Sequence, residues 1–271
     1  MLELTDYVLL SLFGAAGAFM AGFLGVGGGI IYIPVLDYFL QKAGLQNDVL
    51  VKAILANSLF TIIFSGTVAS YKQYKLGNFY PKEILLTALP GIVVALSITY
   101  FIQTGTWYSK SIFNMVFACM LMLIVVKMLI PNKQLENNSK PSSSKFMGVG
   151  SIAGIITAFS GLGGGIVMTP LITDWLKQPI KKASAISNGV IPLFAVCIGV
   201  YNLFGVEVQQ VAVGQFGLVV FPVVFPMILA TFLFAPIGVS TAQKFKAATI
   251  RLVFALFVLL VLSRLLWQQF A

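Results

Sequence analysis

The sequence predicts an all-α polytopic membrane protein made of two inverted repeats of five helical segments each. Of its 271 residues, 59% are hydrophobic and only 9% are charged, whereas soluble domains carry about 25% charged residues. The apolar residues form ten continuous segments, and a glycine-rich stretch near the start of the chain returns in its second half. Together these observations place the chain in a lipid bilayer and divide it into two related halves.

The apolar segments are long enough, in most cases, for the roughly 20 residues that a spanning helix needs. The sixth and seventh have about 15 residues each, and the first two are separated only by a run of glycines. We therefore expect the first two segments of each repeat to form a glycine-broken pair of half-length helices. The segments cover residues 5–24, 28–41, 49–70, 84–102, 107–130, 146–160, 163–177, 183–206, 211–235 and 248–267.

The stretch "PNKQLENNSKPSSSK", residues 131–145, separates the fifth segment from the sixth. It is rich in Ser, Asn and Lys, as flexible linkers are. The expected organisation is a first transmembrane repeat over 1–130, a linker over 131–145 and a second, inverted repeat over 146–271.

The two halves contain related motifs. "FLGVGGGIIYIP" (23–34) and "FSGLGGGIVMTP" (159–170) differ by 136 positions, and "ANSLF" (56–60) resembles "SNGVI" (187–191). Five segments is an odd number, so a second copy must enter the membrane from the opposite side, as in many secondary transporters. The shift of 136 also relates the small-residue stripe Gly14, Ala18 and Gly22 to Gly150, Gly154 and Ala158, and such stripes let helices pack closely in lipid.

The distribution of basic residues predicts the orientation in the membrane. With alternating segments, the side that holds the N-terminus receives four Lys and Arg residues and the other side thirteen. The side rich in basic residues is expected to be cytoplasmic. The linker would then be cytoplasmic and both termini would lie outside.

The glycine runs predict interrupted helices that offer an anion site. Glycine costs about 1 kcal/mol relative to Ala inside a helix, and three in a row should break it. A helix that restarts near Gly29 or Gly165 would present free N–H groups and the positive end of its dipole. The alternative is a glycine-lined helix crossing without a ligand, but the repetition of the motif favours binding.

Polar residues near the glycine runs extend the predicted site. Asn57 and Asn188, each beside a serine, would donate to an anion or instead bond a neighbouring helix. Ser160, Thr169 and Tyr32 are weaker candidates. The predicted substrate-binding residues are Gly25, Gly27, Gly28, Gly29, Asn57, Ser58, Gly161, Gly163, Gly164, Gly165, Ser187 and Asn188.

Several further residues have two interpretations each. Asp37 and Asp174 lie near the ends of short segments, so they are candidates for proton or ion coupling or simply reach the headgroups. Lys52, Lys181 and Lys182 precede the Asn-bearing segments and would attract anions or anchor the topology. Bends are expected at the prolines inside segments four and nine, which are Pro90, Pro222 and Pro226.

The sequence argues against several classes of function. It contains no His and only two Cys, Cys119 and Cys197, both in apolar runs, so neither a zinc site nor a His-ligated haem is expected. We expect no metal and no cofactor. The net charge of +9 is spread over short loops, which indicates membrane topology and not nucleic-acid binding. No ATP-binding motif occurs, and no reactive constellation indicates an enzyme.

The glycine motifs "GFLGVGGGIIYIPVL" and "SGLGGGIVMTPLI", the Asn-bearing segment after each, and the two repeats resemble the TauE/SafE family of membrane permeases. The resemblance covers nearly the whole chain. It implies transport of small sulfur-containing anions, such as sulfite, sulfonates or sulfoacetate, or of other organic anions, across a prokaryotic plasma membrane. One departure is Gly189, which stands where the first half has Ser58, so the two half-sites need not contribute equally.

The resulting prediction is a secondary anion transporter that works by alternating access. An anion channel is the alternative within transport, and a membrane assembly factor or enzyme is the alternative outside it. The expected partners are a small anionic substrate and the lipid bilayer, and a homo-oligomer is compatible with the sequence.

Overall fold

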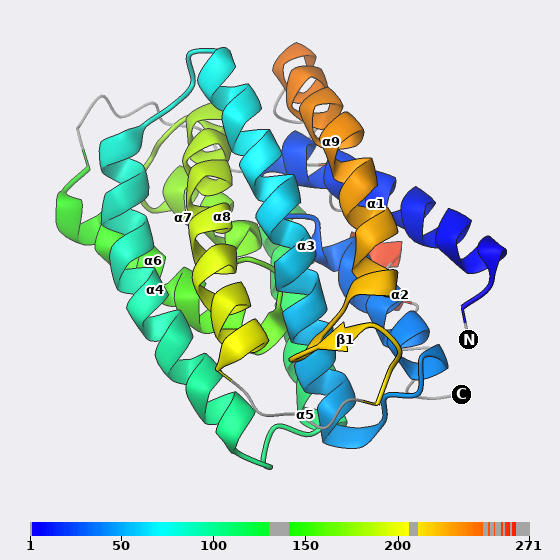
Figure 1. Cartoon of the computed structure of the whole chain (residues 1–271). Helices are drawn as coiled ribbons and strands as arrows, with labels where there is room; N and C mark the ends of the chain where they lie inside the picture. The colour runs from blue at the N-terminus through cyan, green and yellow to red at the C-terminus, as the bar shows by residue number, and fades with distance from the viewer. Residues whose placement is uncertain are drawn as a thin grey trace.

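The computed structural model describes residues 2–129, 141–205 and 211–245, together with the helical positions 249, 252, 256, 258–260 and 262–263. Most of the predicted linker (131–145) and of the tenth segment (248–267) lies outside the described residues. The described elements are α1 (Leu4–Leu24), α2 (Gly29–Lys42), α3 (Asn47–Lys75), α4 (Pro81–Thr104), α5 (Lys110–Leu129), α6 (Ser143–Ser160), α7 (Gly165–Asp174), α8 (Ile180–Phe204), β1 (Gln215–Phe216), β2 (Val219–Val220) and α9 (Phe221–Lys244) (Figure 1).

The helices confirm an all-α membrane protein. Within the described residues, five are long and apolar enough to cross a bilayer: α1, α3, α4, α8 and α9. The prediction of half-length helices is wrong for α1, which has 21 residues. It agrees better with the helices that follow the glycine runs, because α2 has 14 residues and α7 only 10.

The predicted segment 211–235 begins with a short β-hairpin and not with a helix. Strand β1 pairs antiparallel with β2, with Gln215 opposite Val220, and Gly217 has a φ of +54° at the turn between them. Helix α9 begins only at Phe221, with Pro222 in its first turn, where the missing N–H costs nothing. The expected bend at Pro222 is therefore wrong, whereas Pro90 and Pro226 lie inside α4 and α9, again 136 positions apart.

The helices of the two halves pack in a reciprocal pattern. Helix α1 packs along α9 and α6 packs along α4, while α3 and α8 contact each other at the centre. Helix α3 also packs on α9, and α8 on α4. In Figure 1, α3 and α9 run from the bottom of the view to the top, whereas α4 and α8 run from the top to the bottom.

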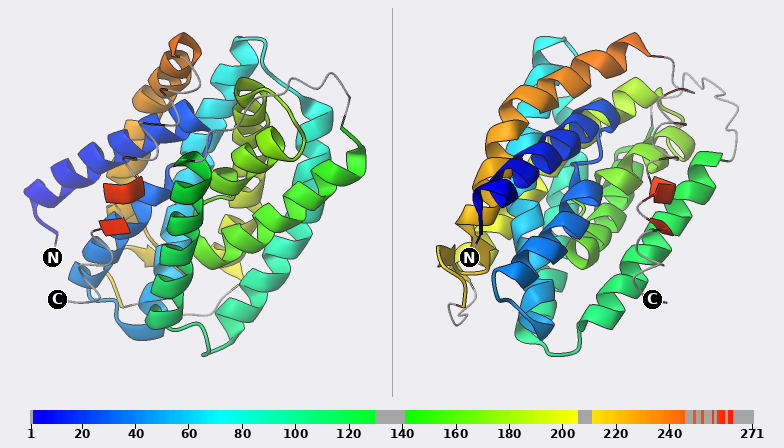
Figure 2. Two further views of the ribbon diagram at one scale, coloured as in Figure 1. Left: turned by 180° about the vertical axis from the view of Figure 1, so that it is seen from behind. Right: turned by 90° about the vertical axis from the view of Figure 1, so that its right-hand side faces the viewer.

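The small-residue stripes explain the closest helix pairs. A Cβ atom on Gly14 would lie 2.5 Å from the Met227 Cα atom of α9, and one on Gly22 would collide with the Ala235 carbonyl oxygen. In the other pair, a Cβ on Gly150 would collide with the Thr87 carbonyl oxygen of α4. The backbones of α1 and α9, which lie side by side in Figure 2, therefore approach each other closely, as the small-residue stripe of α1 predicted.

Candidate functional site

Both glycine runs interrupt a helix, as predicted. Helix α1 ends at Leu24 and α2 begins at Gly29, while α6 ends at Ser160 and α7 begins at Gly165. Left-handed backbone of this kind favours glycine because glycine has no Cβ atom. The φ angles follow the same order in both breaks: +71°, +84° and +79° at Gly25, Gly27 and Gly28, and +68°, +74° and +72° at Gly161, Gly163 and Gly164.

The two breaks contact each other in the interior. A Cβ atom on Gly165 would lie 2.5 Å from the carbonyl oxygen of Gly25, and one on Gly29 would lie 2.8 Å from the Cα atom of Leu162. A Cβ on Gly27 would lie 3.1 Å from the carbonyl oxygen of Leu162. All of these residues are buried, so the structure brings the two predicted glycine clusters together at one place.

The N-termini of α2 and α7 lie at this contact. The Gly28 carbonyl accepts from the N–H groups of Ile31 and Tyr32, as the Gly164 carbonyl does from Val167 and Met168. The N–H groups of the two residues before each of these donor pairs belong to Gly29 and Ile30 in α2 and to Gly165 and Ile166 in α7. They form no hydrogen bond with the described residues. Two positive helix ends with unused donors therefore meet in the buried centre.

The two predicted serines join the halves. The Ser58 hydroxyl of α3 donates to the carbonyl of Gly161 at 2.8 Å, and the Ser187 hydroxyl of α8 donates to the carbonyl of Gly25 at 2.7 Å. Thr169 donates to the same Gly25 carbonyl at 3.4 Å. Helices α3 and α8, the third helix of each half, thus each provide a hydroxyl donor to a carbonyl in the glycine break of the other half. In this conformation these hydroxyl hydrogens are not available to an anion.

The side-chain amide of Asn57 forms hydrogen bonds through both its nitrogen and its oxygen. Its Nδ2 donates to the carbonyls of Ala53 at 2.7 Å and Leu218 at 2.9 Å, and its Oδ1 accepts from the N–H of Val220 at 2.8 Å. The expectation that Asn57 donates to an anion does not agree with this conformation, because both amide hydrogens are occupied. The alternative interpretation, a bond to a neighbouring element, describes it. The partner is the β-hairpin, which the sequence did not predict.

Asn188 differs from Asn57 despite its matching position. Its side chain is fully buried, and neither Nδ2 nor Oδ1 has a hydrogen-bond partner among the described residues. Leaving such a group unpaired costs about 1–3 kcal/mol. The side-chain amide of Asn188, which follows Ser187 in α8, is therefore not used by the described residues.

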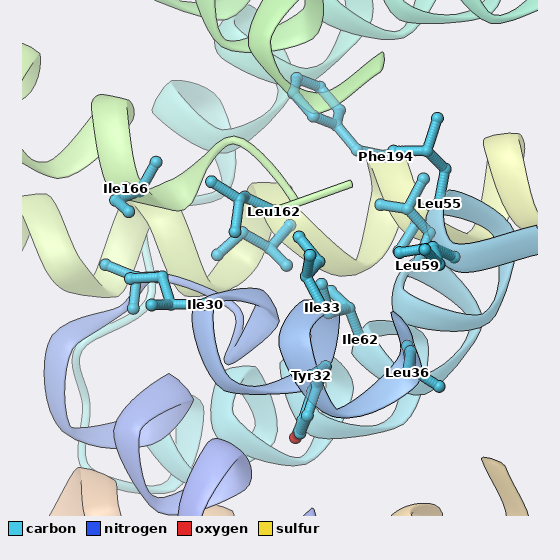
Figure 3. Packing of buried hydrophobic residues seen from close by; sticks show 14 of the residues in the cluster. Ile30, Tyr32, Ile33, Leu36, Leu55, Leu59, Ile62, Leu162, Ile166 and Phe194 are labelled. Carbon is cyan, nitrogen blue, oxygen red and sulfur yellow. The ribbon is translucent and has the colours of Figure 1, made fainter. Parts of the chain in front are cut away.

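Apolar side chains fill the space around the breaks. Figure 3 shows Leu162 lying among Ile30, Ile33 and Ile62. The Cγ2 atoms of Ile62 and Ile191 lie 3.3 Å from the position of a Cβ on Gly163. The sequence analysis did not include Leu162 among the site residues. Its position between Gly161 and Gly163 could have indicated that it lies at the second break.

A pocket reaches the first break from the face where α3 and α9 end and α8 begins. Its lining includes Val26 of the break, Thr169 of α7, Ser184 and Lys181 of α8, and Gln73 of α3. Val26 occupies the same place in the first run that Leu162 occupies in the second.

The acidic candidates lie away from the breaks. Asp37 is partly exposed and pairs with Lys110 at 3.0 Å. Asp174 is the last residue of α7 and is also partly exposed. A buried acid that sequence reasoning missed, Asp6, pairs with Lys42 at 2.8 Å at the start of α1. None of these pairs is part of the glycine site.

The lysines before the Asn-bearing helices contact the ends of other helices. Lys52 donates to the carbonyls of Gln103 at 2.7 Å and Gly105 at 3.0 Å, at the end of α4. Lys181 donates to the carbonyl of Gln243 at 3.1 Å, near the end of α9. Lys182 pairs with Glu83 at 3.6 Å. Over the part of the chain that the structure describes, no group of three or more His, Cys, Asp or Glu side chains could hold a metal ion.

Comparison with known proteins finds relatives that match most of the chain. The chain is 26% identical over 266 residues to a protein of Haemophilus influenzae named "Probable membrane transporter protein", covering 95% of this chain and 97% of that one. It is 24% identical to a protein with a corresponding name from Methanocaldococcus jannaschii, covering 90% and 89%. A third such protein, from Bacillus subtilis, is 22% identical and covers 69% and 74%.

No solved structure matches the chain. The family model described as "Sulfite exporter TauE/SafE" matches residues 10–265. On that match, which includes both glycine breaks and both Asn-bearing helices, the chain belongs to the TauE/SafE family of membrane transporters.

Proposed function

We propose that this chain is a secondary transporter that moves a small sulfur-containing or organic anion across the plasma membrane by alternating access. The proposed substrates are sulfite, sulfonates and sulfoacetate-like anions. The observation that carries this proposal is the meeting of the two glycine breaks, with the N-termini of α2 and α7 at one buried place. Such helix ends bind anions through N–H groups and the helix dipole.

The reciprocal packing supports two inverted repeats. Helix α1 packs on α9 as α6 packs on α4, and α3 contacts α8 at the centre. The third and fourth helices of the halves run in opposite directions (Figure 1). Inverted repeats of this kind place a binding site between the halves and exchange their conformations during transport.

The chemistry of the site follows from its unused donors. The anion would accept from the N–H groups of Gly29, Ile30, Gly165 and Ile166 and from the amide of Asn188. Ser58 and Ser187 would keep the carbonyls of the breaks paired and turned away from it. Because apolar side chains fill the centre in this conformation, Leu162 and Val26 must move before an anion can enter.

The charge distribution supports the orientation. Lys72, Lys75 and Lys244 lie near the ends of α3 and α9, on the face where α8 begins with Lys181 and Lys182. We place this face in the cytoplasm and both termini outside. Asp37 and Asp174 are the remaining candidates for coupling, and both side chains are partly exposed.

Counterflow in liposomes tests the proposal. Purified protein is reconstituted into liposomes loaded with unlabelled sulfite, methanesulfonate or sulfoacetate, and uptake of the same labelled anion is measured. A transporter accumulates labelled anion transiently above its external concentration. An anion channel conducts it without such accumulation, and an assembly factor or enzyme does neither.

A further inference from the structure

The pocket against the first glycine break combines an apolar lining with polar groups at its mouth. We call it the Lys181 pocket, lined by Gln73, Lys181, Ser184, Thr169, Val26 and Gln243 among others. We propose that the Lys181 pocket is a binding site for the negatively charged group of the anion, at the mouth of the path to the glycine breaks. This inference rests on the proposed function, because it assumes that the chain carries an anion.

Lys181 supplies the charge of the pocket. It is exposed at the mouth and donates to the Gln243 carbonyl at 3.1 Å. An ammonium group has three N–H donors, so one such bond leaves donors and the full positive charge for a ligand. A positive charge at the entrance of a pocket with apolar walls raises the local concentration of anions.

Gln73 provides an independent sign of a missing ligand. Its side chain is only 2% exposed and lines the pocket, and its Oε1 atom has no hydrogen-bond partner among the described residues. Buried polar atoms without partners are rare in folded proteins. Rotation of the terminal amide exchanges its oxygen and nitrogen, so Gln73 can donate to an anion that Lys181 attracts.

Ser184 connects the mouth to the first break. It lies three positions after Lys181 on α8, on the same side of the helix. A Cβ atom on Gly25 would lie 2.5 Å from its Oγ atom, and Val26 lines the same pocket. An anion bound at Lys181 is therefore about one helical turn from the break.

The opposite face contains a comparable group of one lysine and two amide side chains. We call it the Lys52 cluster: Lys52 at the start of α3, Gln103 at the end of α4 and Asn202 at the end of α8. Lys181, Gln243 and Gln73 likewise lie near the start of α8 and the ends of α9 and α3, although the shift between the repeats does not relate them to these three residues. In the cluster, Nε2 of Gln103 donates to Oδ1 of Asn202 at 3.2 Å and joins the two helix ends.

The cluster also contains unpaired buried atoms, namely Oε1 of Gln103 and Nδ2 of Asn202. Both faces thus place a lysine and two amides together, one set lining a pocket and the other joined by a hydrogen bond.

Calorimetry on the full-length protein in nanodiscs tests the site. Sulfite, methanesulfonate, sulfoacetate and acetate are titrated, and the anion that binds most tightly is carried forward. Lys181→Gln should raise its Kd about tenfold or more, since it removes a charge-assisted hydrogen bond. Gln73→Leu should weaken binding in the same direction, and Lys181→Arg, which keeps the charge, should restore binding to within about threefold.

Lys182→Gln is the matched control. It removes the same charge one position away, but Lys182 pairs with Glu83 at 3.6 Å and does not line the pocket. Its Kd should stay within about twofold of the unmodified protein. Equal Kd values for Lys181→Gln and Lys182→Gln would overturn the site, as would an unchanged Kd in Lys181→Gln.

Counterflow on the same variants separates this inference from the proposed function. If the unmodified protein transports and Lys181→Gln transports with an unchanged KM, the Lys181 pocket is not a binding site and the transporter proposal stands. If the unmodified protein neither binds nor transports any of the four anions, both proposals are overturned.

Discussion

The backbone N–H of Val220 donates to the side-chain Oδ1 of Asn57 at 2.8 Å, deep inside the protein. The same side chain donates to the carbonyl of Leu218, so one amide in α3 pairs with the hairpin strand as a neighbouring strand would. Asn188, the matching residue of α8, has no such partner among the described residues. The two asparagines are thus alike in sequence and different in bonding.

Asn57→Ala should destabilise the protein, because the Val220 N–H and the Leu218 carbonyl would lose their partner in the interior. We expect a loss of about 2–4 kcal/mol, in line with two buried groups left unpaired. Thermal or chemical unfolding in detergent measures this. An unfolding curve like that of the unmodified protein would show that the hairpin does not depend on Asn57.

Asn188→Leu should leave stability unchanged or raise it, since it replaces an unpaired buried amide by an apolar side chain of similar size. Transport should fall about tenfold or more if Asn188 donates to the anion. Counterflow and thermal unfolding on the same preparation separate the two effects. Full transport by this variant would remove Asn188 from the binding site.

Gly165→Ala should impair transport because the added methyl group would lie 2.5 Å from the Gly25 carbonyl oxygen and push the breaks apart. Gly148→Ala is the control, since its added methyl group would approach only the Trp175 ring, at 3.2 Å, and the substitution favours the helix. Counterflow rates of both variants are compared at equal reconstituted amounts. Equal rates in Gly165→Ala and the unmodified protein would show that contact between the breaks is dispensable.

Ser58→Ala should cost more stability than Ser187→Ala. The Gly161 carbonyl loses its Ser58 partner, with an expected cost of about 1–3 kcal/mol, whereas the Gly25 carbonyl keeps Thr169 at 3.4 Å. Denaturant unfolding of both variants gives the order.

Ser97→Ala is the reference for this pair of variants, because Ser97 is exposed and, within the described part of the chain, donates only to the Val93 carbonyl of its own helix. It should change stability by less than about 0.5 kcal/mol. A smaller loss for Ser58→Ala than for Ser187→Ala would show that Thr169 does not compensate for Ser187 at the Gly25 carbonyl.

Much of the fold was predictable because it depends on local chemistry. The glycine runs predicted the breaks between Leu24 and Gly29 and between Ser160 and Gly165, and the structure confirms both. The hairpin before α9 was not predicted, because residues 211–220 are as apolar as the helix that follows. Hydropathy does not distinguish a short buried strand from a buried helix.

The sequence predicted which residues meet at the glycine breaks, but it did not predict the hydrogen bonds that they form. The serines were expected beside the anion, yet they donate to carbonyls of the opposite half. A hydroxyl pairs with whichever acceptor the fold brings within reach, and those acceptors lie 103 and 162 positions away. Spacing along one helix contains no information about such partners.

The sequence by itself determined the membrane environment, the two related halves and the positions where the helices break, because composition, repetition and glycine act locally. Only the tertiary structure decided that the two breaks touch, that the side chain of Asn57 is paired while that of Asn188 has no partner among the described residues, and that a pocket lies against the first break. Equivalent residues become different when each half packs against the other, since hydrogen bonds and cavities depend on distances between helices that no repeat in the sequence specifies.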